Sequence, residues 1–163
     1  IESITEIRAK AHSLRGDEAR SSLFIELNNH GVGQEYRHTK TTVSLINYHF
    51  VFCPRYRRKV LVSQVESRFK ELVSEICAQN NWLILAMEVM PDHVHLFLNC
   101  LPTDSPSGML ATIRGITSRR LREEFPHLRH LPSLWTRSFF VSTAGNVSSD
   151  TIRRYVEAQK KRG

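Results

Sequence analysis

The sequence lacks any apolar run near the ~18 residues that a membrane-spanning helix needs, so no membrane span is predicted. It also lacks internal repeats and low-complexity segments, which excludes a repeat architecture. Its three cysteines are widely spaced and include no Cys-x-x-Cys pair, which argues against a disulfide framework. Residues 1–20 are polar and charged, unlike a secretory signal. We therefore expect a cytoplasmic protein whose thiols are reduced.

The 163 residues have instead an ordinary globular composition, with 40% hydrophobic and 24% charged side chains. The formal net charge is +7 and is unevenly distributed. Residues 1–34 carry four basic and five acidic side chains, whereas residues 35–163 carry nineteen and eleven. A domain this basic favours a polyanionic partner, most often nucleic acid. On charge alone, a basic protein without such a partner is about equally expected.

A loop signal at residues 28–33, NNHGVG, separates two parts of the chain. Before it, apolar residues at helical spacing predict a short helix within residues 2–20. The rest of the chain is long enough for one domain with its own core. We therefore divide the chain into an N-terminal extension of unknown role, residues 1–34, and a main domain, residues 35–163.

Hydrophobic periodicity in the main domain predicts the order strand, helix, strand, strand, helix, strand, helix. The expected elements, in that order, are residues 41–53, 64–80, 82–90, 93–99, 106–125, 134–143 and 151–161. Ser105 is the expected N-cap of the second helix, with Pro106 at its first position. The first six elements have the βαββαβ order of ferredoxin-like folds. This order predicts an α+β protein with a four-stranded antiparallel sheet and both middle helices on one face.

The segment MPDHVHLFLNC places two histidines in the strand predicted at residues 93–99. Side chains alternate across a strand, so His93 and His95 share one face and the intervening apolar residues share the other. The apolar face belongs to the core, which leaves the histidines on the face without helices. Their Cβ atoms are then about 7 Å apart, close enough for both imidazoles to bind one divalent metal ion. Alternatively, one histidine makes a local hydrogen bond and the other is solvated.

Two histidines leave a metal site incomplete, and no acidic residue is an obvious third ligand. Asp92 precedes the pair. It can either stabilise the turn or accept a hydrogen bond that orients one of the imidazoles. His49 lies in the first predicted strand and can reach the same face, although a lone histidine is more often structural.

The final predicted helix carries Tyr155 and Gln159 four residues apart, on one helical face. With Ile152 and Val156 they follow the spacing of a packing stripe, and packing is the simpler interpretation. Glutamine is unusual in such a stripe, however, and its amide oxygen is a neutral ligand for a metal ion. A tyrosine beside a metal ion can act as a nucleophile on a phosphodiester.

Three segments together carry a resemblance: NYHFVFCPRYRRKVL, MEVMPDHVHLFL and LWTRSFFVSTAGNVSSDTIRRYVEAQ. They resemble the small single-tyrosine HUH transposases of bacterial and archaeal insertion sequences, where U is a hydrophobic residue. The resemblance runs from about Tyr36 to the C-terminus. It implies that His93, His95 and Gln159 bind Mg²⁺ or Mn²⁺, and that Tyr155, on the C-terminal helix, is the nucleophile.

The same resemblance implies a reaction and its partners. Such transposases cleave and rejoin single-stranded DNA through a 5′-phosphotyrosine intermediate. They recognise hairpins near the ends of the element, and they act as homodimers whose active sites are shared between the subunits. Their fold is the ferredoxin-like sheet that the order of elements predicts.

Two groups of basic residues are candidates for contacts with the DNA backbone. The loop after the first strand carries Arg55, Arg57, Arg58 and Lys59. The second helix carries Arg119 and Arg120. The helical group is equally consistent with a solvated face, because two glutamates follow it. Four aromatic residues could stack on unpaired bases: Tyr48, Phe50, Tyr56 and Trp135. Core positions are more common for aromatic residues in strands.

Three alternatives to a transposase remain open on the sequence. A domesticated relative would process chromosomal repeat hairpins by the same chemistry. A non-catalytic single-stranded nucleic-acid-binding protein would carry aromatic residues at the middle of the central strands, where this chain has His93 and His95. A metal-dependent phosphodiesterase that uses water would not need Tyr155.

Overall fold

The computed structural model describes residues 36–144. The predicted helices within residues 2–20 and 151–161 lie outside the described residues, as do Tyr155 and Gln159. The proposed domain boundary after residue 34 also lies outside them, so it stays a prediction.

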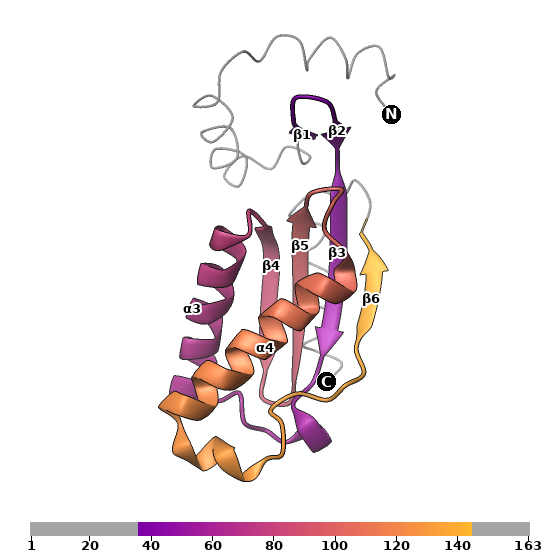
Figure 1. Ribbon diagram of the computed structural model, residues 1–163. Helices are drawn as coiled ribbons and strands as arrows, with labels where there is room; N and C mark the ends of the chain where they lie inside the picture. The colour runs from indigo at the N-terminus through magenta and orange to yellow at the C-terminus, as the bar shows by residue number, and fades with distance from the viewer. Residues whose placement is uncertain (1–35, 145–163) are drawn as a thin grey trace.

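A four-stranded antiparallel sheet forms the centre of the fold, in the spatial order β4-β5-β3-β6 (Figure 1). Its strands are β3 (Ile46–Phe52), β4 (Leu83–Met90), β5 (His93–Cys100) and β6 (Phe140–Thr143). The first and third strands of the chain order are thus the central pair, which is the pairing that a βαββαβ fold requires. The predicted fold class is confirmed.

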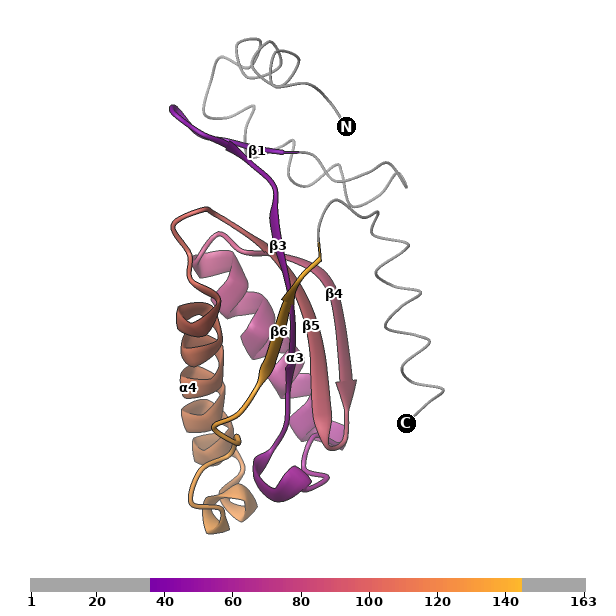
Figure 2. The same cartoon turned by 90° about the vertical axis from the view of Figure 1, so that its right-hand side faces the viewer.

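Two helices, α3 (Ser63–Gln79) and α4 (Pro106–Glu124), cover one face of this sheet. Figure 2, viewed from the β6 edge, places α4 clearly to one side of the strands. As predicted, Ser105 caps α4, and its hydroxyl accepts a hydrogen bond of 3.1 Å from the backbone N–H of Gly108. Within the described residues, neither helix is long and apolar enough to cross a membrane.

The core lies between the helices and one set of alternating strand residues. Phe50 of β3 and Leu96 of β5 face each other across the strands and are fully buried. Apolar residues of both helices complete the cluster, including Phe69 and Ile113. The alternation predicted for residues 93–99 is therefore confirmed: the apolar set faces the helices, and the histidines lie on the other face.

The predicted strand at residues 41–53 is wrong in its first part. Residues Val43–Ser44 form strand β2, which pairs with β1 (Arg37–His38) in a separate two-stranded hairpin beyond the end of the sheet (Figure 1). The turn of this hairpin is closed by Thr39, whose hydroxyl accepts a hydrogen bond of 3.0 Å from the backbone of Thr42. Strand propensity predicts that a segment is extended, but it does not show with which neighbour the strand pairs.

The predicted strand at residues 134–143 is too long, because β6 begins only at Phe140. Before it, Trp135 is buried between Phe52 and Phe69, with ring centroids 5.0 and 5.5 Å away. Its indole N–H donates a hydrogen bond of 3.0 Å to the hydroxyl of Thr117 on α4. The backbone of Trp135 still pairs with Pro54 as an isolated antiparallel bridge, so the predicted strand is interrupted between Trp135 and Phe140.

Four aromatic residues are candidates for base stacking, and burial rules it out for two of them. Phe50 and Trp135 are buried in the core. Tyr48 packs partly against that core, and Tyr56 is 66% exposed. The three cysteines are all free, as expected.

Replacing Thr117 with Val should lower the free energy of unfolding by about 1–3 kcal/mol, measured by urea denaturation. Valine keeps the shape of the side chain but leaves the buried indole N–H of Trp135 without an acceptor. The control is Thr117→Ser, which keeps the hydroxyl and should cost less. Equal losses in the two variants would contradict a role for this hydrogen bond.

Candidate active site

Three histidines gather on the open face of the sheet, opposite the helices. His93 and His95 come from β5, and His49 comes from the adjacent central strand β3. His49 is 5% exposed and His95 is 8% exposed, whereas His93 lies nearer the end of the strand and is more accessible. Glu88 of β4 is paired with His95 in the ladder and so lies on the same face.

His93 is held from behind by a carboxylate. Its Nδ1 lies 2.7 Å from Oδ1 of Asp92 in the preceding turn. The other oxygen of Asp92 accepts a hydrogen bond of 3.2 Å from Arg57. The hydrogen bond from His93 and the charge of Arg57 lower the pKa of Asp92, so it is ionised at neutral pH. Asp92 therefore occupies the place from which it can orient the His93 imidazole.

His95 is held from behind by a second imidazole. Its Nδ1 lies 3.1 Å from Nε2 of His49. The His49 ring in turn stacks on Phe97, with centroids 4.1 Å apart and planes inclined by 5°. Burial, and then repulsion by His95, lowers the pKa of His49 to about 4. Burial also lowers the pKa of His95, so both rings are neutral at neutral pH, the form in which imidazole binds metal ions.

The two β5 histidines are therefore arranged alike: Nδ1 of each ring contacts a protein side chain, and Nε2 of each ring is left for a ligand. Both engage a side chain through Nδ1, which leaves Nε2 on each ring. The rings are 5.3 Å apart between centroids and nearly perpendicular, at 81°. Between residues 36 and 144, no three His, Cys, Asp or Glu side chains form a group that could hold a metal ion. The described residues thus present two imidazoles on one face, and a metal site here would need a third donor from another part of the chain.

The basic loop after β3 is tied to this site. Its short 3-10 helix η2 (Arg55–Arg57) carries Arg57, the partner of Asp92, so the loop lies next to His93. Tyr56 and Arg57 adopt left-handed backbone angles, with φ of 59° and 50°. The guanidinium groups of Arg55 and Arg58 lie 5.2 and 6.0 Å from the centre of the exposed Tyr56 ring. Lys59 is exposed as well, so the loop presents a cluster of positive charge.

The second basic group lies on the other side of the sheet. Arg119 and Arg120 belong to α4, which covers the core face, and Arg120 forms an ion pair of 3.5 Å with Glu124. The structure thus links the first basic group to the histidines through Arg57 and Asp92, and it keeps Arg119 and Arg120 apart from them.

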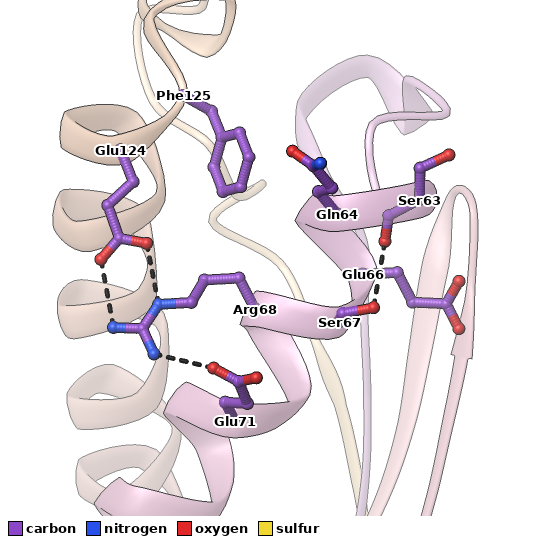
Figure 3. A pocket seen from close by; sticks show the side chains of 8 residues that line it. All are labelled: Ser63, Gln64, Glu66, Ser67, Arg68, Glu71, Glu124 and Phe125. Atoms are coloured by element: carbon purple, nitrogen blue, oxygen red, sulfur yellow. Dashed lines mark hydrogen bonds and ion pairs between the residues drawn. The ribbon is translucent and has the colours of Figure 1, made fainter.

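A shallow groove between α3 and α4 has a different character. Figure 3 shows Arg68 lying between Glu124 and Glu71, with ion-pair distances of 2.8 and 3.0 Å. These charges satisfy one another, and no histidine lines the groove. The groove lies on the helical side, so we do not assign the chemistry to it.

The sequence predicts that His49 can reach the same face, but not that it contacts His95. The useful signal was its phase in the strand: it alternates with the buried residues Phe50 and Phe52 and therefore faces the same way as the β5 histidines. That it contacts His95 depends on the register between β3 and β5, which no local pattern reveals.

Comparisons with known proteins show the family to which the chain belongs. Residues 42–159 match the family model of IS200-like transposases. The ISDra2 transposase TnpA of Deinococcus radiodurans is 33% identical over 117 residues, which are 70% of this chain and 84% of that protein. The transposase for the insertion sequence element IS200 of Salmonella typhimurium is 30% identical over 115 residues, 69% of this chain and 75% of that protein.

A solved structure gives the same result. A protein of D. radiodurans whose crystal structure was assigned as a transposase has a TM-score of 0.62 and 33% sequence identity to this chain. The match covers 74% of this chain and 95% of that chain. Since the similarity extends over most of the main domain in both sequence and fold, the chain belongs to the IS200-like transposases, a family of DNA transposition enzymes of insertion sequences.

Proposed function

We propose that this transposase cleaves and rejoins single-stranded DNA at the ends of an insertion sequence through a 5′-phosphotyrosine intermediate. The observation that carries the proposal is the pair His93 and His95, each held through Nδ1 with Nε2 left for a ligand. The family match supports it further, because it extends to residue 159 and so includes Tyr155 and Gln159.

A divalent metal ion fits the donors of this site. Two neutral imidazoles from one rigid strand, with the amide oxygen of Gln159 as the third ligand, would hold Mg²⁺ or Mn²⁺. Nitrogen donors suit Mn²⁺ better than Mg²⁺, which prefers oxygen. When bound, the ion polarises the scissile phosphate and stabilises the charge that develops on it.

Tyr155 supplies the nucleophile in this proposal. Its phenolic oxygen loses a proton and attacks the phosphorus, while the bond from phosphorus to the 3′ oxygen breaks. The 3′ oxygen takes up a proton and leaves as a hydroxyl group. One phosphodiester replaces another, so rejoining by the reverse attack of a 3′ hydroxyl needs no nucleotide cofactor.

The DNA would be bound as a hairpin with an unpaired flank. The basic loop at residues 55–59 suits the flank, because it joins the histidine site through Arg57 and Asp92 and carries further exposed cations. Following the family resemblance, we propose a homodimer in which the histidines of one subunit work with the tyrosine helix of the other.

The nucleophile is tested with the substitution Tyr155→Phe, which removes only the phenolic oxygen. Protein is incubated with Mn²⁺ and single-stranded DNA carrying the flanking element end, and a denaturing gel is run. We expect a covalent protein–DNA band from the wild type and none from the variant. Cleavage without an adduct that persists in Tyr155→Phe would instead indicate hydrolysis by water. Tight binding without cleavage in the wild type would indicate a binding protein.

The metal ligands are tested with His95→Ala. Cleavage should be lost, because one of the two imidazole donors is gone. Hairpin binding, measured by fluorescence anisotropy, should be largely unchanged, since it depends on distributed phosphate contacts. The matched control is His130→Ala, an exposed histidine in η3 (Pro126–His130), which should leave both measurements unaffected. Loss of binding together with cleavage in a folded His95→Ala protein would contradict this division of roles.

The DNA path is tested by comparing the two basic groups. Replacing Arg58 and Lys59 together with Ala should weaken binding of single-stranded DNA. It should also reduce the slope of log affinity against log salt by about 1.4, since each phosphate contact contributes about 0.7. The matched double variant at Arg119 and Arg120 should have a smaller effect, because α4 lies on the opposite face. A larger effect at α4 would place the DNA on the helical side.

A further inference from the structure

We infer that His49 is a positioning residue of the metal site: its Nε2 accepts a hydrogen bond from Nδ1 of His95 and thereby fixes the orientation and tautomer in which His95 binds the ion. The inference rests on the proposed metal-dependent function and deepens it. His49 itself does not contact the ion or the DNA in this assignment.

The contact follows from the register of the central strands. His49 is directly opposite Phe97, and its side chain reaches diagonally along the open face to His95, two residues away on β5. The two ring nitrogens are 3.1 Å apart, within ordinary hydrogen-bond distance. Diagonal neighbours on one face are near enough for long or aromatic side chains to meet.

The His49 ring has little freedom to turn. It lies parallel to the Phe97 ring at 4.1 Å, and both side chains are almost completely buried. The edge of Phe140 on β6 packs from the other neighbouring strand, with centroids 6.0 Å apart. Packing on two sides therefore holds Nε2 where it faces His95.

The chemistry of metal binding determines which way the proton must point. An imidazole that binds an ion through Nε2 uses the lone pair of that nitrogen, so its proton is on Nδ1. Nδ1 of His95 then donates, and Nε2 of His49 accepts. Histidine ligands commonly donate their second N–H to a protein acceptor in this way, which fixes the ring and its tautomer.

The two halves of the site are supported differently. His93, at the accessible end of the strand, is backed by the carboxylate of Asp92. His95, deeper in the sheet, is backed by an imidazole. A carboxylate at the position of His49 would be buried against Phe97, where an unpaired charge is costly. A neutral acceptor avoids that cost, which is a physical reason for a histidine at this position.

The test measures Mn²⁺ binding by the full chain without DNA, by titration calorimetry or by the electron paramagnetic resonance signal of free Mn²⁺. The matched pair of variants is His49→Gln and His49→Met, which have the same length and differ in the presence of an acceptor. We expect His49→Met to weaken Mn²⁺ binding about 10- to 100-fold. His49→Gln should restore most of the affinity. A third variant, His49→Phe, keeps an aromatic ring on Phe97 and should behave like His49→Met.

Stability is measured on the same samples, because a structural role for His49 would lower the thermal midpoint in all variants alike. Equal Mn²⁺ affinity in wild type and His49→Met overturns the inference, and so does an equal loss in the Gln and Met variants. If His49→Met does not fold, His49→Phe takes its place against His49→Gln. The proposed function fails separately, in the wild type, if that protein forms no tyrosine adduct with DNA.

Discussion

The antiparallel register between β3 and β5 determines both faces of the sheet at once. Where Phe50 meets Leu96 the face is apolar and closed by helices, and one residue further along, His49 meets Phe97 on the open face. A slip of one residue would exchange the two sets, bringing imidazoles into the core and leucines to the surface. The strong burial of the apolar set therefore holds the histidines in position. Stability and the geometry of the site depend on the same pairing.

Side chains that contact the Nδ1 atoms of His93 and His95 hold the two imidazoles in place. Each β5 histidine is fixed through Nδ1 by a side chain from a different element: Asp92 from the β4–β5 turn and His49 from β3. Asp92 also binds Arg57, which connects the loop after β3 to the turn. A site assembled from three connected elements keeps its donors in place better than one carried by a mobile loop. Through Arg57 it also connects the exposed basic loop to the turn that carries Asp92.

The two faces of the sheet differ in how their polar side chains are arranged. On the helical side, Arg68 and Arg120 both form ion pairs with Glu124. On the open side, polar groups are buried in small numbers and are held in defined contacts. Exposed ion pairs of the first kind contribute little to stability. Burying imidazoles costs more, and side chains whose pKa is shifted by burial cluster at functional sites.

Local patterns in the sequence were sufficient for the fold class, the helix cap at Ser105 and the face on which His93 and His95 lie. Each of these depends on the spacing of neighbouring residues, which the chain carries in its own order. The split of residues 41–53 into two strands and the burial of Trp135 were not predictable in the same way, because they depend on segments far away in the sequence. The same holds for His49, which on its own is an ordinary strand residue. Only the pairing of β3 with β5 brings its Nε2 to His95, and such a register is decided by the packing of the whole core.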